Sequence, residues 1–383
     1  MTTRDFTANV ISATPVVPDG NFKDSKASGV WDINEALDLI KGGNWPNVAN
    51  INPSAFVNAL FQTHLYTGNN TSTAIDNGIN LSGKGGMVWT KNRDDTQTSF
   101  IHDTERGATK LISPNDTNGE ETQSSSLTSF NSNGFTVNNL YVNNNGDDYV
   151  SWTFRKQPKF FDVLTYTGDG NDGRTISHSL GSTPGMIIVA RRDSTNYWRV
   201  WHRSQTGKYA NLYATGAFAS DSASNGVFNN YSGNSSTFTA GININASSAT
   251  YVAYLFAHNN DDGGFGEPGD QDIIKCGTYA GNGNDARTID LGFEAQWVLV
   301  KRSDGTTDWW ILDNMRGLHA RQISGKYLEA NTSNAEASQG NFFADSQGFM
   351  VDAGDYNSSG ENYIYMAIRR GGMQTPTAGT DVF

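Results

Sequence analysis

The fold of this chain is decided by the stretch YTGDGNDGRTISHSLGSTPGMIIVARRD, residues 166–193. Its short runs rich in Ile and Val alternate with Gly, Asn, Asp and Ser, which is typical of strands joined by tight turns. Gly181 and Pro184 separate the two runs, so neither run is long enough for a helix of three turns. The stretch therefore predicts antiparallel β structure.

The same pattern occurs three times along the chain. Tyr66, Tyr166 and Tyr279 open equivalent stretches, and the later landmarks keep nearly the same spacing in each copy. These landmarks are the apolar runs MVWTKNRD (87–94), MIIVARRD (186–193) and WVLVKRSD (297–304), and the closing strands DYVSWTF (148–154), TYVAYLF (250–256) and NYIYMAI (362–368). Repetition at a fixed period indicates one structural unit copied in tandem.

Each unit is predicted to be a compact antiparallel sandwich of jelly-roll type, because about eight short strands fall within each copy. In TYVAYLF the apolar positions fill both faces, as expected of a central strand in a two-sheet stack. The chain is thus expected to be mainly β, with three tandem concanavalin A-like repeats and a short N-terminal helical segment. The expected boundaries are a docking segment at 1–60, repeats at 61–157, 163–258 and 274–371, and a flexible tail at 372–383.

Gly168, Gly170 and Gly173 have the G-x-G-x-x-G spacing of dinucleotide-binding loops, and Gly281, Gly283 and Ala286 have its tolerated variant. A dinucleotide site needs a helix directly after the glycines, since the helix N-terminus holds the pyrophosphate. Here a strand-like alternation follows instead. We predict tight hairpin turns and no cofactor.

The same two turns offer hard oxygen ligands for a cation such as Ca²⁺. No glutamate follows at the position that completes an EF-hand loop, and Asn and Asp in loops are more often turn formers than ligands. Turn formation is favoured, with a metal site kept as the weaker alternative. The candidate ligands are Asp169, Asn171, Asp172, Asn282, Asn284 and Asp285.

The composition of the chain argues against nucleic-acid binding, an internal disulfide and a membrane span. The formal net charge is −12, and no Lys/Arg run exceeds a pair, so nucleic-acid binding is not expected. Cys276 is the only cysteine, which excludes an internal disulfide. The N-terminus has no apolar leader, and no apolar run is long enough for a membrane span. The chain is expected to be made as a soluble cytosolic protein.

Catalytic signals are weak. The six histidines show no metal-ligand spacing, and His102 and His202 are interpreted as the same repeat position, where the third repeat has Asp313. No nucleophile elbow is present, and no Asp/Glu pair recurs in all three repeats. We expect no enzyme activity. A glycoside hydrolase stays open as the alternative, because only spatial separation identifies its two carboxylates.

Four tryptophans are the best candidates for a contact surface: Trp198, Trp201, Trp309 and Trp310. Adjacent strand residues point to opposite faces, so one of Trp309 and Trp310 is expected in the core and the other at the surface. Exposed aromatic rings beside Asn and Asp loops suit glycan or partner binding. The alternative for each ring is packing between sheets or between repeats.

The first sixty residues differ from the rest. In SGVWDINEALDLIKGGNWP (28–46), Asp32 and Glu35 form a capping box, and Gly42 and Gly43 end a helix predicted at about 32–42. One amphipathic helix has too little core to stand alone, so it is expected to dock on another protein or on the first repeat. The candidate docking residues are Trp31, Ile33, Leu37, Ile40 and Trp45.

Residues 27–46 resemble a GVW-(S/D)-x-x-E-A…G-x-WP segment of virion proteins from tailed phages, especially marine and cyanobacterial ones. The repeats resemble the concanavalin A-like jelly-roll modules of phage tail fibres and other structural proteins, and the likeness covers residues 28–371. The first repeat departs at residues 66–86, which lack the glycine turn.

This resemblance implies a virion protein at the tail or outer surface, made in the host cytoplasm, most simply a tail fibre or tail appendage. It implies attachment to other virion proteins through the N-terminal segment, lectin-like binding of a host-surface glycan, and a homo-oligomer, trimeric by analogy. Two alternatives stay open, namely a capsid-surface decoration protein without a receptor role and a polysaccharide depolymerase.

Overall fold

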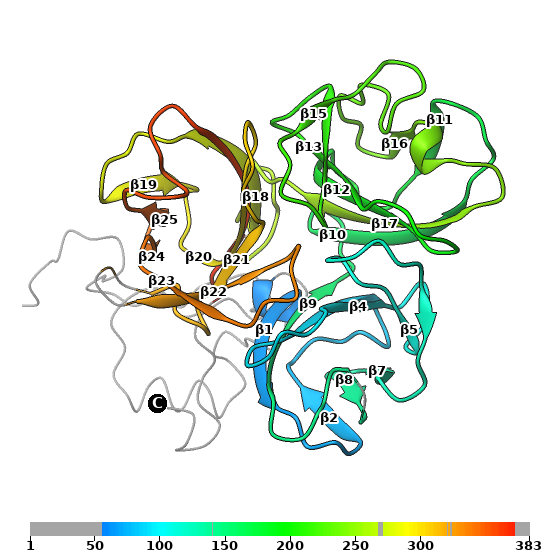
Figure 1. The fold of residues 1–383 in the computed structure, drawn as a ribbon, viewed down its shortest axis with the longest axis horizontal. Coiled ribbons are helices and arrows are strands. Elements are labelled where there is room, and N and C mark those ends of the chain that lie inside the picture. The colour runs from blue at the N-terminus through cyan, green and yellow to red at the C-terminus, as the bar shows by residue number, and fades with distance from the viewer. Residues whose placement is uncertain (1–55, 140, 267–270, 320, 322–323, 372–383) are drawn as a thin grey trace, which may run out of the picture. The chain divides into compact units, whose positions relative to one another are not determined.

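A computed structural model describes residues 56–139, 141–266, 271–319, 321 and 324–371 (Figure 1). Within these ranges the chain is mainly β and has no α-helix, as expected from its short apolar runs. The described residues belong to one compact unit. The predicted helix at 32–42, the docking residues Trp31 to Trp45 and the tail at 372–383 lie outside the described residues and stay predictions.

The strands fall into three consecutive segments, which we call the first (61–155), second (161–257) and third (274–369) segments. The first contains β1 (Phe61–Thr67), β2 (Thr73–Asp76), β3 (Gly86–Asn92), β4 (Phe100–Asp103), β5 (Lys110–Leu111), β6 (Glu121–Thr122), β7 (Leu127–Asn131), β8 (Gly134–Val137) and β9 (Asp148–Arg155). The second contains β10 (Phe161–Thr167), β11 (Arg174–Ser177), β12 (Pro184–Arg191), β13 (Arg199–His202), β14 (Lys208–Asn211), β15 (Ala219–Ser220), β16 (Thr237–Ala240) and β17 (Thr250–Ala257). The third contains β18 (Ile274–Ala280), β19 (Arg287–Asp290), β20 (Ala295–Arg302), β21 (Trp310–Asp313), β22 (Gly325–Glu329), β23 (Ala337–Gln339), β24 (Phe342–Asp345), β25 (Gly348–Val351) and β26 (Asn362–Arg369). Short 3₁₀ turns occur at Val57–Ala59 and Ile242–Ile244.

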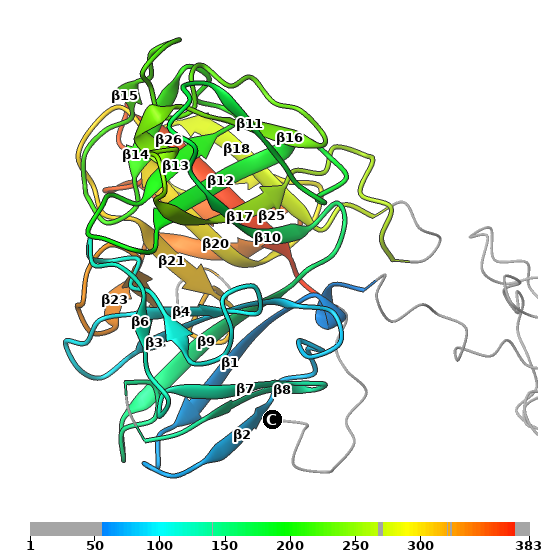
Figure 2. The same cartoon turned by 90° about the vertical axis from the view of Figure 1, so that its right-hand side faces the viewer.

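The order of strands in the main sheet recurs from segment to segment. The sheets begin β1-β9-β3-β4, β10-β17-β12-β13 and β18-β26-β20-β21, so the last strand of each segment pairs between its first and third strands. All of these pairings are antiparallel. A smaller sheet accompanies each main sheet, with the orders β2-β8-β7, β11-β16 and β19-β25-β24. Figure 2 shows β2, β7 and β8 side by side.

The turns after the opening strands explain the glycine pattern. Gly170 and Gly173 have φ of 80° and 75°, and Gly283 and Ala286 have φ of 71° and 56°, which is the left-handed region. The residues after Gly173 form β11 rather than a helix. The stretch is therefore a turn, and it has no helix N-terminus for a pyrophosphate.

Gly168 is needed for a different reason, since its backbone packs directly against another loop. A Cβ at Gly168 would lie 2.1 Å from the Ala246 carbonyl oxygen, and Gly68 and Gly281 meet the Asn144 and Ser358 oxygens in the same way. The first glycine of the pattern thus permits a close approach of two backbones in every segment.

In the first and third segments, the two faces of the main sheet pack into different apolar clusters. On β20, Trp297 and Leu299 belong to the largest apolar cluster, whereas Val298 and Val300 belong to a cluster within the third segment. The largest cluster takes residues from all three segments. The two apolar faces of β3 and β20 therefore serve two cores, one inside the segment and one shared between segments. In the second segment, both faces of β12 belong to the largest cluster.

Phe154 shows how the shared core joins the segments. Its ring centroid lies 5.4 Å from that of Phe256 in the second segment and 5.8 Å from that of Trp297 in the third. Both pairs are edge-to-face, the arrangement that aromatic quadrupoles favour.

Backbone hydrogen bonds connect the segments in a cyclic order. Two such bonds join each consecutive pair, and the third segment returns to the first. The first and second segments are joined by Glu120 N to Arg192 O (2.7 Å) and Asn196 N to Thr117 O (2.9 Å). The second and third are joined by Phe218 N to Ser303 O (2.9 Å) and Thr307 N to Thr215 O (3.1 Å). The third and first are joined by Glu336 N to Arg93 O (2.8 Å) and Gln97 N to Ser333 O (2.9 Å).

Strand register corrects the predicted equivalence of the histidines. His202 pairs with Met186 as Asp103 pairs with Met87, so His202 is level with Asp103 and not with His102. Asp313 holds the same position in the third segment, opposite Trp297. The sequence comparison was wrong by one residue because a histidine occurs at either of two adjacent positions.

Each of these three level residues contacts the next segment. The Tyr254 hydroxyl donates to Asp103 Oδ2 at 2.8 Å, and Trp152 Nε1 donates to Asp313 Oδ2 at 2.9 Å. His202 Nε2 lies 3.1 Å from the carbonyl oxygen of Tyr365. These three residues therefore lie at the boundaries between segments.

Candidate functional site

A cavity of about 430 Å³ opens on the third segment. Trp310 at the start of β21 and Tyr327 and Glu329 on β22 form one side, and loops at 302–308 and 355–361 form the other. Trp310 pairs with Glu329 across the two strands, which brings the indole and the carboxylate to the same place. Strand pairing thus positions the cavity's aromatic and acidic groups.

Aromatic rings form a continuous wall. The centroids of Trp310 and Tyr327 lie 3.8 Å apart with nearly parallel rings, and Tyr356 lies 4.4 Å from Trp310. Tyr356 is buried and its hydroxyl donates to the Asp308 carbonyl oxygen at 2.7 Å, whereas Trp310 and Tyr327 keep partial exposure. Burial raises the pKa of Tyr356 well above its usual range, so this ring stays neutral.

Carboxylates dominate the polar lining. Asp308, Glu329, Asp355 and Glu361 face a single Arg302, which pairs with Glu361. Burial, followed by the charges of Glu329, Asp308 and Asp355, raises the pKa of Tyr327. Carboxylate oxygens accept hydrogen bonds from hydroxyl groups, and the rings offer apolar surface for C–H groups. The cavity therefore suits a polyhydroxylated ligand without negative charge.

Glu329 is held in place from behind. The Thr332 hydroxyl donates to its Oε2 at 2.7 Å and the Asn334 amide donates to the same oxygen at 3.0 Å. A carboxylate oriented by two donors presents its other oxygen, Oε1, in a defined direction.

The four tryptophan candidates separate into core and cavity. Trp309 is buried and its indole lies 3.3 Å from two carbonyl oxygens of the second segment, whereas Trp310 lines the cavity. This agrees with the expected split between adjacent strand residues. Trp198 stacks on Tyr254 and Trp201 donates to the Tyr231 carbonyl oxygen at 3.0 Å. Trp198, Trp201 and Trp309 are each at most 1% exposed, so in this structure their rings are packed in the interior.

The weak metal candidates are engaged in turn hydrogen bonds. Asp169 accepts from the Asn171 N–H at 2.9 Å and from the Asn245 amide at 2.6 Å. Asn282 occupies the same place in the third segment, where it accepts from Asn284 N–H at 3.0 Å. The remaining two, Asp172 and Asp285, accept backbone donors from Asn225 and Ala353. Among the described residues no three His, Cys, Asp or Glu side chains cluster as metal ligands would.

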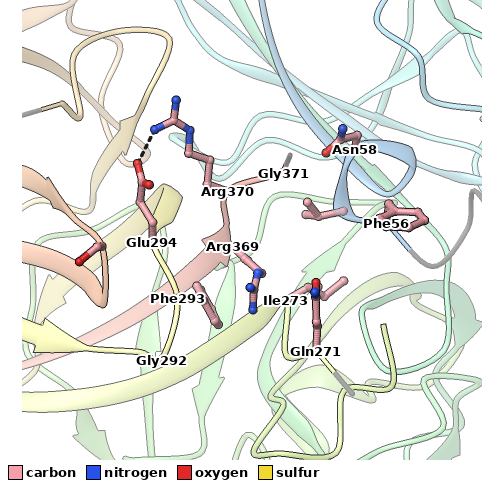
Figure 3. Close-up of a pocket in the computed structure, with 12 residues that line it drawn as sticks. Phe56, Asn58, Gln271, Ile273, Gly292, Phe293, Glu294, Arg369, Arg370 and Gly371 are labelled. Atoms are coloured by element: carbon pink, nitrogen blue, oxygen red, sulfur yellow. Dashed lines mark hydrogen bonds and ion pairs between the residues drawn. The ribbon is translucent and has the colours of Figure 1, made fainter. Parts of the chain in front are cut away.

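A second cavity, of about 560 Å³, lies where the ends of the described chain meet (Figure 3). Arg369 stacks on Phe293 at 5.7 Å, and Arg370 pairs with Glu294 at 2.5 Å. Gly371 packs against the side chain of Asn58, so the residues that lead out of the described region at both ends are adjacent. Both arginines of this second cavity already contact residues of the protein itself. The second cavity is therefore a weaker candidate for ligand binding than the aromatic cavity of the third segment.

Two buried histidines, His102 and His202, lie away from the cavity of the third segment. Burial lowers the pKa of both His102 and His202 to about 3, and they lie in different segments. His102 Nε2 lies 3.2 Å from the Ser126 hydroxyl. Neither histidine lines the cavity of the third segment.

Sequence reasoning missed Tyr327, Tyr356 and Glu329. Each is a single aromatic or acidic residue in its stretch, and no motif marks it. The available signal is register: Trp310 sits on the strand that precedes β22, so alternate residues of β22 share its face.

The chain was compared with protein-family models and with curated proteins. A family model described as Domain of unknown function (DUF7483) matches residues 53–370. No curated protein matches the chain. Within the described residues, no helix has the length and apolar character needed to cross a bilayer.

Proposed function

The chain belongs to the DUF7483 family, and from its residues we propose that it is a structural protein of a tailed-phage virion. In this proposal it is a tail fibre or tail appendage, and its third segment binds a host-surface glycan. Residues 1–60 attach it to other virion proteins. The phage assignment rests on the resemblance of residues 27–46 and of the tandem units to virion proteins.

We also propose that the three segments are copies of one jelly-roll-like sandwich. The recurring strand order and the equivalent glycines Gly68, Gly168 and Gly281 support this. A homo-oligomer, trimeric by analogy with phage fibres, stays part of the proposal.

The observation that carries glycan binding is the cavity of Trp310, Tyr327 and Glu329. It combines apolar ring surface with hydrogen-bond acceptors, the combination that a sugar ring and its hydroxyls require. Of the four tryptophans predicted to contact a ligand or partner, Trp310 lines this cavity and is partly exposed. The excess of carboxylates favours a neutral or amino sugar at this cavity.

An array of bacterial surface polysaccharides tests the proposal, with the full chain as the probe. We expect binding to a limited set of neutral or amino-sugar glycans, and a loss of about tenfold or more in affinity for Trp310→Ala. Tyr327→Ala and Asp355→Asn alter other residues that line the cavity, and we expect them to weaken binding as well. These two variants test the proposal if Trp310→Ala does not fold. Met315→Ala, at a residue 51% exposed on the same segment, is the matched control.

The outcomes separate the alternatives. Silence on the array, with unaltered adsorption of particles that lack the protein, would support a decoration protein and overturn glycan binding. Release of reducing sugar from a bound polysaccharide would support the depolymerase, whose carboxylates would come from the same cavity.

A further inference from the structure

Arg199 holds the place in the second segment that Trp310 holds in the third. It opens β13, where its partner across the sheet is Asn211, just as Trp310 opens β21 opposite Glu329. Tyr209 on β14 is the counterpart of Tyr327 on β22. The second segment thus replaces an indole and a carboxylate by a guanidinium and an amide.

Two tyrosine rings lie against this guanidinium. Arg199 Cζ lies 4.8 Å from the ring centroid of Tyr197 and 5.0 Å from that of Tyr209. Tyr213 stacks behind Tyr197 at 5.3 Å with an interplanar angle of 14°. Stacking of this kind holds the planar group in one orientation, and it leaves the N–H donors at the edge of the plane.

The edge donors are only partly used. Arg199 Nη1 donates to Asn211 Oδ1 at 2.7 Å, while Nε is buried without a hydrogen-bond partner. Arg199 forms no ion pair with any carboxylate in the described part of the chain. By contrast, the nearby Arg191 and Arg192 pair with Asp193 and Glu120.

The Arg199 guanidinium keeps an uncompensated positive charge, although the chain as a whole has a net charge of −12. Tyr197 beside it is 47% exposed, one of two large hydrophobic side chains that the described surface exposes most. A flat cation with fixed donors therefore lies next to an accessible aromatic face.

We propose that Tyr197, Arg199, Tyr209 and Tyr213 form a binding site for a carboxylate-bearing saccharide. The guanidinium edge donates to the carboxylate of a uronic acid, and the exposed ring of Tyr197 packs against the sugar ring. One guanidinium matches one carboxylate, whereas a polyphosphate requires several cations. The inference shares with the proposed function the idea that the protein binds saccharide, but it uses a different segment and the opposite charge preference.

Calorimetric titration of the full chain with oligogalacturonate tests this site, with the methyl-esterified oligomer as the neutral comparison. We expect the acid form to bind about tenfold or more tightly than the ester, and added salt to weaken it. Arg199→Gln should remove the difference between acid and ester. Arg199→Lys should restore it only in part, because an ammonium lacks the planar fork.

Arg203→Gln is the matched control, since it removes the same charge from an exposed arginine that no tyrosine covers. Trp310→Ala should leave oligogalacturonate binding unchanged, so failure here is distinct from failure at the third segment. Equal affinity for acid and ester, or equal losses in Arg199→Gln and Arg203→Gln, would overturn the proposal. Loss of binding in Tyr197→Ala, which removes only an exposed ring, would support it independently of folding.

Discussion

The indole Nε1 of Trp152 donates a hydrogen bond of 2.9 Å to Oδ2 of Asp313, although the two residues belong to the first and third segments. Both side chains are fully buried, and Arg316 also donates to the same carboxylate at 2.8 Å. The guanidinium of Arg316 lies over the Trp152 ring at 5.3 Å. This group closes the cyclic order of the segments with a fully paired buried charge.

Removing the carboxylate of Asp313 should lower the free energy of unfolding more than removing the indole N–H of Trp152. Asp313→Ala leaves the buried Arg316 without its nearest counter-ion, which costs about 3–5 kcal/mol in the free energy of unfolding. Trp152→Phe removes one hydrogen bond to a charge that stays paired, for about 1–3 kcal/mol. Urea denaturation measures both. Similar values for the two variants would contradict this reading of the closure.

Ala286→Gly and Gly173→Ala should change the free energy of unfolding in opposite directions. Both lie in the left-handed region, with φ of 56° and 75°. Ala286→Gly relieves a backbone conformation that costs an L-residue about 1–2 kcal/mol, so we expect a net gain of about 0.5–1 kcal/mol after the entropy of glycine is counted. Gly173→Ala should lower stability by a similar amount. A loss in Ala286→Gly would show that the turn conformation is misassigned.

Gly168 should tolerate no side chain. Its added Cβ would lie 2.1 Å from the Ala246 carbonyl oxygen, so Gly168→Ala requires the two loops to separate. We expect a loss of about 2 kcal/mol or more. Gly216→Ala is the matched control, because a Cβ there meets nothing within 4 Å. Thermal unfolding of both variants gives the comparison, and equal midpoints would refute the close approach.

Acid should destabilise the protein below pH 6.5. The folded pKa of His102 and His202 is lowered to about 3 and that of His258 to about 4, in each case by burial first. Between these values and the unfolded pKa near 6.5, the unfolded chain binds protons that the folded chain does not. Stability is therefore lost as pH falls, at about 1.4 kcal/mol per pH unit for each of the fully buried His102 and His202. His258 is partly exposed, so solvent screening makes its contribution smaller.

Denaturation at pH 7, 5.5 and 4.5 measures this slope. His202→Gln removes one titrating group and should make the dependence on pH shallower over this window. An unchanged slope would mean that His202 is already protonated in the folded protein.

Much of the local structure can be predicted from the sequence, because it depends on neighbouring residues. Gly and Asn mark the turns, short apolar runs mark the strands, and the alternation of strand residues places Trp309 inside and Trp310 at the cavity. The helix expected at 32–42 and the contact role of Trp31 and Trp45 stay predictions.

What the sequence does not reveal depends on residues far apart. The apolar faces of β20 look like one sandwich strand, yet they serve two cores, because the second core forms only when three segments meet. Trp198 and Trp201 are aromatic residues in a polar stretch, and nothing local shows that Tyr254 and Tyr231 cover them. The alignment of His202 with Asp103 likewise needs the strand register.

The most direct test of the account is a crystal structure of the full chain with the neutral oligosaccharide that the array selects. We predict a sugar ring against Tyr327 and Trp310, with hydroxyl groups donating to Glu329 or Asp355. A neutral saccharide bound elsewhere, with this cavity empty at saturating ligand, would contradict the central claim that the cavity of the third segment binds a neutral glycan.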